Sequence, residues 1–394
     1  MRFELPTALA ISITCTCTCT CGVFAEVLLV PEDYPTIQTA MDNASPGDII
    51  DLAAGTWTDQ IVWGLSGVTL RGRNGDGSTI LDGIDQDWSL VVCYGDPCTI
   101  EHITFRNGKG SNVFGIIRGG AIYAEYSEVT ITDCVFESNQ LVLGEFDFTS
   151  WGGAIASYSA PMNIERCVFT GNSAEGSGGA IYANFAPIDV RNCEFTDNSA
   201  LRTGGGIAGE WVDLTIDDST FRSNHAEWLG GGIYLATAED QSAGTTSTVT
   251  NCRFVRNHAS DAGFAMGGGI AIEYAQLVRV SDSSFEDNYG YIAGAIRGGS
   301  LGSNGFVETS NVLYCGNAIA TNWGEVIDDG TSVFQQSCDC SVDADGDGTV
   351  GVDDLLRVLS AWGSFAPDAD VDNDGSIGVD DLLTVIAGWG IDCE

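Results

Sequence analysis

Short apolar segments alternate with polar positions along most of the chain, with a period of two residues. Val129-Thr130-Ile131 is followed two residues later by Cys134-Val135-Phe136, and residues 188–195 repeat this pattern. A period of two with many β-branched residues predicts strands rather than helices. Glycine and asparagine separate these segments, and no stretch with helical periodicity lies between them. We therefore expect strands that are joined by turns alone.

Two short phrases return at a regular spacing between about residues 100 and 320. A Gly-Gly-small-Ile phrase and a Phe-x-x-Asn phrase recur together every 26 to 33 residues, with the first phrase near Gly119, Gly152, Gly178, Gly205, Gly231 and Gly268. A period of this length indicates stacked units that share one core. Since only strands and turns are available, each strand can pair only with its equivalent one period later. The sequence therefore predicts an all-β fold, a single-stranded right-handed parallel β-helix.

Stacking of equivalent positions predicts ladders inside the coil. The aromatic positions should stack on one another: Phe105, Phe136, Phe169, Phe195, Phe221, Phe254, Phe285 and, as a last member, Tyr314. Two residues earlier, on the same side of the strand, lie small residues that we interpret as core rather than as a metal or redox line: Cys134, Cys167, Cys193, Ser219, Cys252 and Ser283. The following turn holds asparagines that tolerate a positive φ and can bond along the stack: Asn139, Asn172, Asn198, Asn224, Asn257 and Asn288.

Charge narrows the range of partners. The 394 residues carry a formal net charge of −40, and Lys109 is the one lysine. Without a basic patch, nucleic acid and anionic membrane surfaces are disfavoured as partners. Beyond the first 25 residues, no stretch is apolar for long enough to predict a transmembrane helix.

The N-terminal segment has the features of a signal peptide. Arg2 precedes a largely apolar stretch, and Ala25 ends a small-residue cleavage site, so we assign residues 1–25 to the leader and expect a secreted protein. Disulfides can form outside the cell. Cys93 and Cys98 flank a short loop and are candidates for pairing. Four further cysteines could form two bridges of open connectivity: Cys315, Cys338, Cys340 and Cys393.

The start of the mature chain predicts a cap. Residues 34–41 have the pattern of a short amphipathic helix, which would cover the unpaired end of the coil. This stretch, with Gly47-Asp-Ile-Ile-Asp51 and Ala54-Gly-Thr-Trp57, resembles the opening of pectin-lyase-like β-helix proteins. The repeats are similar to those of polymorphic outer-membrane proteins. These resemblances imply a β-helix over residues 26–325 but supply no catalytic residue.

The C-terminal segment contains two acidic twelve-residue loops that begin 27 residues apart. Each has Asp at positions 1, 3, 5 and 12, Gly at position 6 and an apolar residue at position 8. Calcium binds six to eight oxygens, and the glycine permits the sharp turn between them. Each loop leads into a helical apolar pattern. The pair therefore predicts two bound calcium ions in residues 341–394, after a linker at 326–340.

The two loops with one helix each resemble a type I dockerin, a small α-helical calcium-binding domain. The resemblance implies the ligands Asp343, Asp345, Asp347, Thr349 and Asp354 for one ion, and Asp370, Asp372, Asp374, Ser376 and Asp381 for the other. Loop positions 10 and 11 are Val-Asp, where cellulosomal dockerins often carry a Ser/Thr pair. With the Trp-Gly ends, the tail is more similar to the surface-anchoring dockerins of planctomycete-type bacteria. The implied partner is a cohesin-like or cell-surface protein.

Three turns of the repeat are longer than the others. The insertions at 107–119, 139–152 and 257–267 carry aromatic residues that are candidates for glycan binding: Phe114, Phe146, Phe148, Trp151 and Phe264. Aromatic rings beside carboxylates suit sugars, and long loops on a rigid scaffold often carry function. The alternative is that these side chains cover one another as a small satellite core.

Two functional hypotheses follow. In the first, the chain is a secreted, non-catalytic surface protein, an adhesin, spacer or glycan-binding scaffold attached through its dockerin. In the second, it is a polysaccharide-degrading lyase or glycoside hydrolase attached in the same way. The residues show no catalytic constellation, which favours the first hypothesis.

Overall fold

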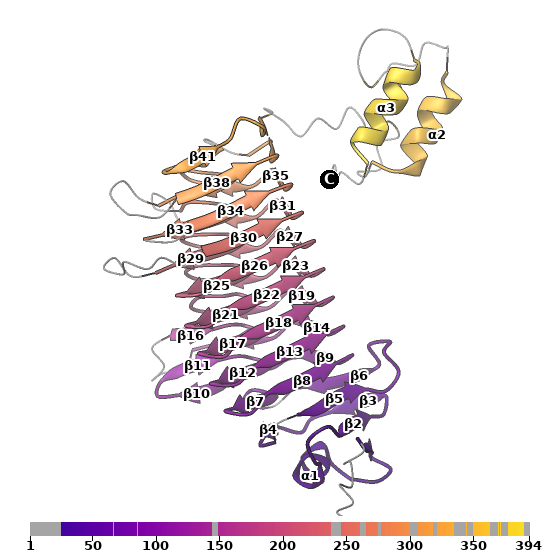
Figure 1. Ribbon diagram of the computed structural model, residues 1–394, viewed down its shortest axis with the longest axis vertical. Coiled ribbons are helices and arrows are strands. Elements are labelled where there is room, and N and C mark those ends of the chain that lie inside the picture. Colours follow the sequence, from indigo (N-terminus) through magenta and orange to yellow (C-terminus); the bar gives the residue numbers. More distant parts are fainter. Residues whose placement is uncertain are drawn as a thin grey trace, which may run out of the picture.

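The structure, a computed structural model, is a rod of stacked coils (Figure 1). It describes residues 25–65, 67–84, 86–143, 149–237, 246–260, 265–274, 277–299, 306–317, 321–334, 344, 350–362, 369, 371 and 377–389. The predicted signal peptide therefore lies outside the described residues, apart from Ala25.

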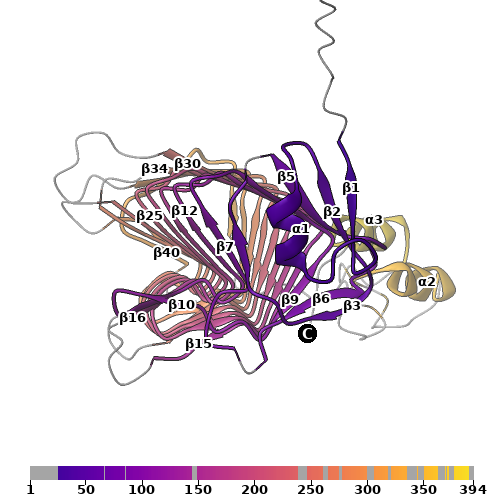
Figure 2. The same cartoon turned by 90° about the horizontal axis from the view of Figure 1, so that it is seen from below.

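Three long parallel sheets form the walls of the rod, here called A, B and C (Figure 2). Sheet A comprises β1 (Val27–Val30), β2 (Ile49–Leu52), β5 (Val68–Gly72), β8 (Cys98–Glu101), β13 (Val129–Thr132), β18 (Met162–Glu165), β22 (Ile188–Arg191), β26 (Leu214–Asp217), β30 (Thr246–Thr250), β34 (Leu277–Ser281), β38 (Phe306–Ser310) and β41 (Val326–Asp328). Sheet B comprises β3 (Gly55–Trp57), β6 (Thr79–Asp82), β9 (Thr104–Arg106), β14 (Val135–Glu137), β19 (Val168–Thr170), β23 (Glu194–Thr196), β27 (Thr220–Arg222), β31 (Arg253–Val255), β35 (Ser284–Glu286), β39 (Leu313–Cys315) and β42 (Val333–Phe334).

Sheet C is the third wall, and two smaller sheets, D and E, lie beside some of the coils. Sheet C comprises β4 (Ile61–Trp63), β7 (Val91–Tyr94), β12 (Ile122–Glu125), β17 (Ile155–Tyr158), β21 (Ile181–Asn184), β25 (Ile207–Glu210), β29 (Ile233–Ala236), β33 (Ile270–Glu273), β37 (Ile296–Arg297) and β40 (Asn322–Trp323). Sheet D contains β10 (Ser111–Val113), β11 (Ile116–Arg118) and β16 (Thr149–Trp151). Sheet E contains β15 (Gln140–Leu141), β20 (Ser173–Ala174), β24 (Ser199–Ala200), β28 (His225–Ala226), β32 (His258–Ala259) and β36 (Tyr289–Gly290).

The predicted pairing of each strand with its equivalent one coil later is confirmed. Phe136 pairs in register with Phe169, and Ile131 pairs with Ile164. The rod continues past residue 325, because β41 pairs with β38 and β42 pairs with β39. Its last strands therefore lie within the segment that the sequence assigned to a linker.

The predicted ladders form the core. Consecutive rings from Phe105 to Phe285 stack with centroids 4.6 to 4.9 Å apart, and Tyr314 and Phe334 extend the stack. The interpretation of the cysteine positions as core residues is confirmed, because Cys134, Cys167, Cys193 and Cys252 are buried and carry free thiols. The Cys93–Cys98 disulfide is confirmed. Cys315 is also disulfide-bonded.

The asparagine ladder bonds along the stack as predicted. The side-chain amide of Asn172 donates to the side-chain carbonyl of Asn198 (2.9 Å) and to the backbone carbonyl of Phe136 (2.9 Å). The positive φ, however, belongs to the residue before each asparagine, as in Asp197 and Ser223. Each asparagine instead joins three successive coils, which pins the turn that leads to the insertions.

Helices lie at both ends of the described chain. The predicted cap is α1 (Ile37–Asn43), whose Thr36 side chain accepts the Thr39 N–H and whose apolar face packs on β1, β2 and β4. Near the C-terminus, α2 (Val352–Ser360) and α3 (Val379–Ala387) pack on each other around Val358 and Val385. No helix in the described residues is long and apolar enough to cross a membrane.

Candidate functional site

The first two insertions of the rod join to form one projecting sheet. After Asn107 the chain leaves the coil and makes an antiparallel hairpin of β10 and β11, and β11 then pairs with β16 of the next insertion. In Figure 2 this sheet lies to one side of the stacked coils. Both insertions begin at the turn pinned by the asparagine ladder, so a rigid element positions them.

The structure separates the predicted glycan-binding aromatics. Phe114 lies at the tip of the hairpin and is 96% exposed. Trp151 is half-buried and stacks on Tyr182, with centroids 4.8 Å apart, while Arg118 lies 5.1 Å above its ring. Trp151 therefore packs on a small cluster of sheet C residues, whereas the alternative considered from the sequence was that the insertion side chains cover one another. Phe146, Phe148 and Phe264 lie outside the described residues.

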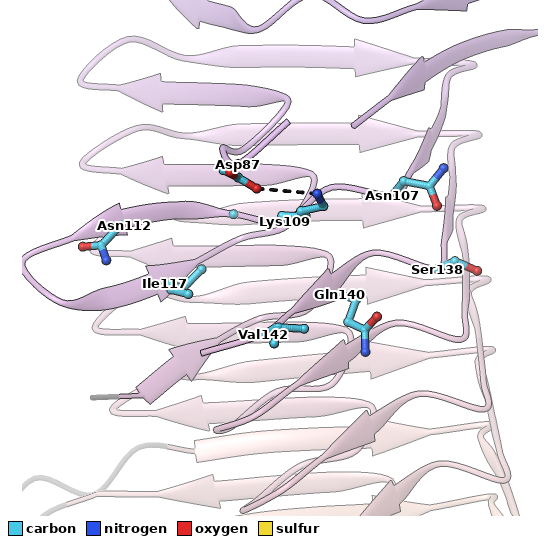
Figure 3. A pocket seen from close by; sticks show the side chains of 9 residues that line it. Asp87, Asn107, Lys109, Asn112, Ile117, Ser138, Gln140 and Val142 are labelled. Carbon is cyan, nitrogen blue, oxygen red and sulfur yellow. Dashed lines mark ion pairs between the residues drawn. The ribbon is translucent and has the colours of Figure 1, made fainter. Parts of the chain in front are cut away.

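A pocket of about 470 Å³ opens where the hairpin meets the edge of the coil (Figure 3). Amide, hydroxyl and charged side chains line it together with two aliphatic ones: Asp87, Asn107, Lys109, Gly110, Asn112, Ile117, Ser138, Gln140 and Val142. The Lys109 ammonium and the Asp87 carboxylate form an ion pair at 3.5 Å, and Asp87 is 90% exposed. The pocket thus combines donors and acceptors with apolar surface, as expected for a site that binds a polyhydroxylated ligand.

The sequence interpretation missed these polar residues. The residues predicted from the insertions were aromatic, whereas amides and the single lysine near the hairpin line the pocket. One signal was available, because Lys109 occurs inside an insertion of a strongly acidic chain.

The outward face of sheet C carries a second group of titratable residues. Tyr123, Tyr182 and Tyr234 alternate with alanines along this face, and the half-buried Trp151 and Leu229 pack on the cluster that holds Tyr182 and Tyr234. The Tyr182 hydroxyl donates to Glu210 at 3.0 Å, and Tyr234 donates to Glu273 at 2.8 Å.

Burial sets the protonation of this face. Burial and the neighbouring carboxylate raise the pKa of Tyr182 and of Tyr234, so both remain neutral phenols that donate hydrogen bonds. Burial also raises the pKa of Glu210, and the hydrogen bond from Tyr182 opposes this shift. Glu210 therefore holds its proton more tightly than an exposed glutamate does.

Of the ten predicted calcium ligands, Asp354 and Asp381 lie within the described residues. The side chains of both are almost fully buried. A carboxylate oxygen accepts the backbone N–H of Gly351 at 2.6 Å in one loop and of Gly378 at 2.7 Å in the other. Both glycines have the same backbone angles, φ −147° and ψ −155°. Two equivalent, buried, oriented carboxylates fit the oxygen donor set that a hard cation requires.

The other eight predicted ligands lie outside the described residues: Asp343, Asp345, Asp347, Thr349, Asp370, Asp372, Asp374 and Ser376. Their role in binding calcium stays a prediction. The apolar residues at loop position 8, Val350 and Ile377, are buried in the small core between the helices.

Comparisons with known proteins concern the rod. A family model described as "Right handed beta helix region" matches residues 63–311. No curated protein matches the sequence. Similar solved structures include a pectin methylesterase from Aspergillus niger, with 16% identity over 76% of this chain and 88% of that chain and a TM-score of 0.41.

Two further structures show similarity of the same order. A family 28 exopolygalacturonase from Yersinia enterocolitica has 12% identity over 80% of this chain and 78% of its own, with a TM-score of 0.45. PfbA, a surface adhesin of Streptococcus pneumoniae, has 13% identity over 79% of this chain and 92% of its own, with a TM-score of 0.42. At these values the similarities carry no information about activity or substrate.

Proposed function

This chain belongs to the right-handed β-helix family, and from that premise we propose that it is a secreted, non-catalytic rod that binds glycans and is attached to a surface through its C-terminal helices. The rod serves as a rigid spacer that presents the insertion hairpin. The helices supply a calcium-dependent attachment to a cohesin-like or other cell-surface protein.

The pocket beside the hairpin carries the proposal for the rod. Gln140 offers a donor and an acceptor, and Ser138 adds a hydroxyl. Asn107 and Asn112 also line the pocket, where the Asn107 amide donates to Asp82 (2.8 Å) and the Asn112 side-chain carbonyl accepts the Gly115 N–H (2.9 Å). Ile117 and Val142 add an apolar patch on which the C–H face of a sugar ring can rest. A rigid scaffold holds these groups in place, which reduces the entropy lost on binding.

Exposed apolar residues support the attachment role of the tail. Leu356 and Leu383 occupy equivalent positions of α2 and α3, and both are more than half exposed. Three further equivalent pairs in or just after these helices are each about half exposed or more: Val352 and Val379, Leu359 and Ile386, Trp362 and Trp389. Apolar surface of this kind marks protein interaction sites in soluble proteins. Its repetition in both helices fits the repeat of the dockerin-like sequence.

Calcium would be held by the two acidic loops and would supply the charge balance that lets their carboxylates converge. Asp354 and Asp381 are already oriented for this role by the N–H groups of Gly351 and Gly378. Calcium binding would then hold the loops against the N-terminal end of each helix.

Binding measurements on the whole mature protein test the proposal. We expect saturable binding to at least one polysaccharide from a panel of neutral and acidic glycans, with no new reducing ends. Gln140→Ala and Lys109→Met should each weaken binding about 3- to 10-fold, the effect of losing one or two hydrogen bonds. Arg166→Met, a surface cation that is not part of the pocket, is the matched control. Unchanged affinity in both pocket variants, or no binding to any glycan, would contradict the proposal.

A polysaccharide-degrading activity is the second candidate, and Glu210 is the observation that favours it. Its raised pKa favours the protonated form, which a general acid requires. Incubation of the protein with the same glycan panel distinguishes the two candidate functions, because a lyase releases unsaturated uronate and a hydrolase releases reducing ends. Loss of that product in Glu210→Gln would assign the activity to sheet C.

A further inference from the structure

Three rows of residues with a positive φ run along the rod, one at each of three turns. Two rows use mainly residues for which this left-handed conformation costs little. The first comprises His102, Asp133, Arg166, Asn192, Asp218, Asn251, Asp282 and Asn311, and the second comprises Asn107, Ser138, Asp197, Ser223, Arg256 and Asp287. The coil-to-coil backbone hydrogen bonds impose this conformation on whichever residue occupies the turn.

The third row lies at the corner that follows strands of sheet C, and four of its five residues other than glycine are aromatic. Its left-handed residues are Tyr126, Ser159, Phe185, Trp211 and Tyr274, with φ between 50° and 62°. A positive φ is a real outlier for a bulky side chain. Because Asn or Ser would satisfy the same backbone at lower cost, these rings are retained against local strain, and such strain is typical of functional positions.

Five rings at this corner form a continuous line, here called the corner aromatic row: Tyr126, Phe185 and Trp211 at the left-handed position, and Tyr94 and Tyr158 at the strand end one residue earlier. Successive ring centroids are 6.2, 6.0, 5.8 and 5.4 Å apart. Tyr94, Tyr126 and Phe185 are each about half exposed or more. In the core, the phenylalanine ladder has the same period but is fully buried, so the corner row is a second aromatic ladder that faces solvent.

Polar groups accompany the corner aromatic row. Glu125 and Glu210 end their strands of sheet C one residue before Tyr126 and Trp211, and both are half-buried. Their carboxyl groups accept hydrogen bonds from the hydroxyls of Tyr123 and Tyr182. The net charge of −40 repels a polyanion.

We propose that the corner aromatic row binds an extended, uncharged polysaccharide chain that runs along the rod axis. This inference rests on the proposed glycan-binding function and adds a second site with its own ligand class. Coils repeat about every 4.8 Å along the axis, which is close to the length of one pyranose unit in an extended chain. Tyr94, Tyr126, Tyr158 and Phe185 meet edge to face, and Phe185 stacks on Trp211. Alternate rings can therefore present a face on which the C–H groups of a sugar pack, while the rings between them present an edge.

The test uses substitutions that relieve the strain while removing the ring. Phe185→Asn and Tyr126→Asn introduce the residue type found at the equivalent turns of the other rows. The full chain in calcium is titrated with cello-, manno- and xylo-oligosaccharides of two to eight units. We expect affinity to rise with length up to about five units, and each variant to raise Kd about 3- to 10-fold with an unchanged or higher melting temperature. Tyr274→Asn is the matched control, since Thr237 separates it from the row.

The other outcomes overturn the inference in distinguishable ways. If the melting temperature falls and oligosaccharide binding is unchanged, the rings have a structural role. If Lys109→Met weakens binding of neutral chains but Phe185→Asn does not, the proposed function stands and this second site fails. If no glycan binds, both fail. If the wild-type chain self-associates and Phe185→Asn abolishes this, the row binds a second copy of the chain.

Discussion

The rod and the helical pair near the C-terminus bury their apolar residues in different ways. In the rod each coil covers the next, so that side chains such as Phe195 and Asn198 have no exposed surface. In the tail, α2 and α3 bury Val358 and Val385 but leave Leu356 and Leu383 more than half exposed. Repetition therefore supplies the rod with a continuous core, whereas the helical pair has only a small core and leaves much apolar surface exposed.

Calcium removal is expected to produce the largest difference in stability between the rod and the helical pair. A chelator should abolish the helical circular dichroism signal of the tail and leave the strand signal of the rod intact, because two ions, each at about 1,000 times its Kd, together stabilise the tail by roughly 8 kcal/mol. The rod core needs no such ligand. A helical signal that persists in chelator would contradict both the calcium assignment and this comparison.

Truncation of one core ring is the next largest effect. Phe195→Ala removes a member of the ladder whose neighbours stack at 4.7 and 4.6 Å, and it should lower the free energy of unfolding of the rod by about 3–5 kcal/mol. Denaturant unfolding followed by strand signal measures this. Phe114→Ala, at the exposed hairpin tip, is the control and should change stability by no more than about 0.5 kcal/mol. Equal effects of the two would show that the ladder is not the core.

The fold could be predicted because stacking leaves a direct record in the sequence. Every coil repeats the same inward positions, and in-register pairing then follows from the period, as with Phe136 and Phe169. The end of the rod was harder to place. Residues 326–334 lack the Phe-x-x-Asn phrase but still pair with the last full coil, since backbone hydrogen bonds do not require it.

Less of the candidate site than of the fold could be predicted from the sequence. The insertions were recognised by length, but the pocket depends on the approach of Asp87, Lys109 and Gln140 in space, and these residues lie in separate segments of the sequence, Gln140 in β15. The corner aromatic row was missed for another reason. Tyr126 and Phe185 occur at the same repeat position, yet their significance lies in a positive φ that only the three-dimensional structure reveals.

A smaller effect is expected for the dependence of the rod's stability on pH. Because burial raises the pKa of Glu210 above its usual value of 4.5, the folded state binds more protons than the unfolded state between these two pKa values. The stability of the rod should therefore decline as the pH rises from 4.5 through the raised pKa, and Glu210→Gln should remove part of that decline. Thermal unfolding from pH 4 to pH 8 measures it. Glu194→Gln, at an exposed position, is the control, and an identical pH profile for Glu210→Gln and the parent would contradict the argument.

The smallest expected effect on stability concerns the exposed face of the tail. The double variant Leu356→Gln and Leu383→Gln replaces exposed side chains with a residue of similar helix propensity, so the melting of the helical signal in calcium should shift by no more than about 0.5 kcal/mol in free energy. Binding of a hydrophobic dye should nevertheless fall, because the apolar surface is lost. Val358→Gln places an amide in the buried core of the same helix and should unfold the tail even in calcium. If the double variant were as destabilising as Val358→Gln, Leu356 and Leu383 would be core residues, and the tail would not present the docking face that distinguishes it from the rod.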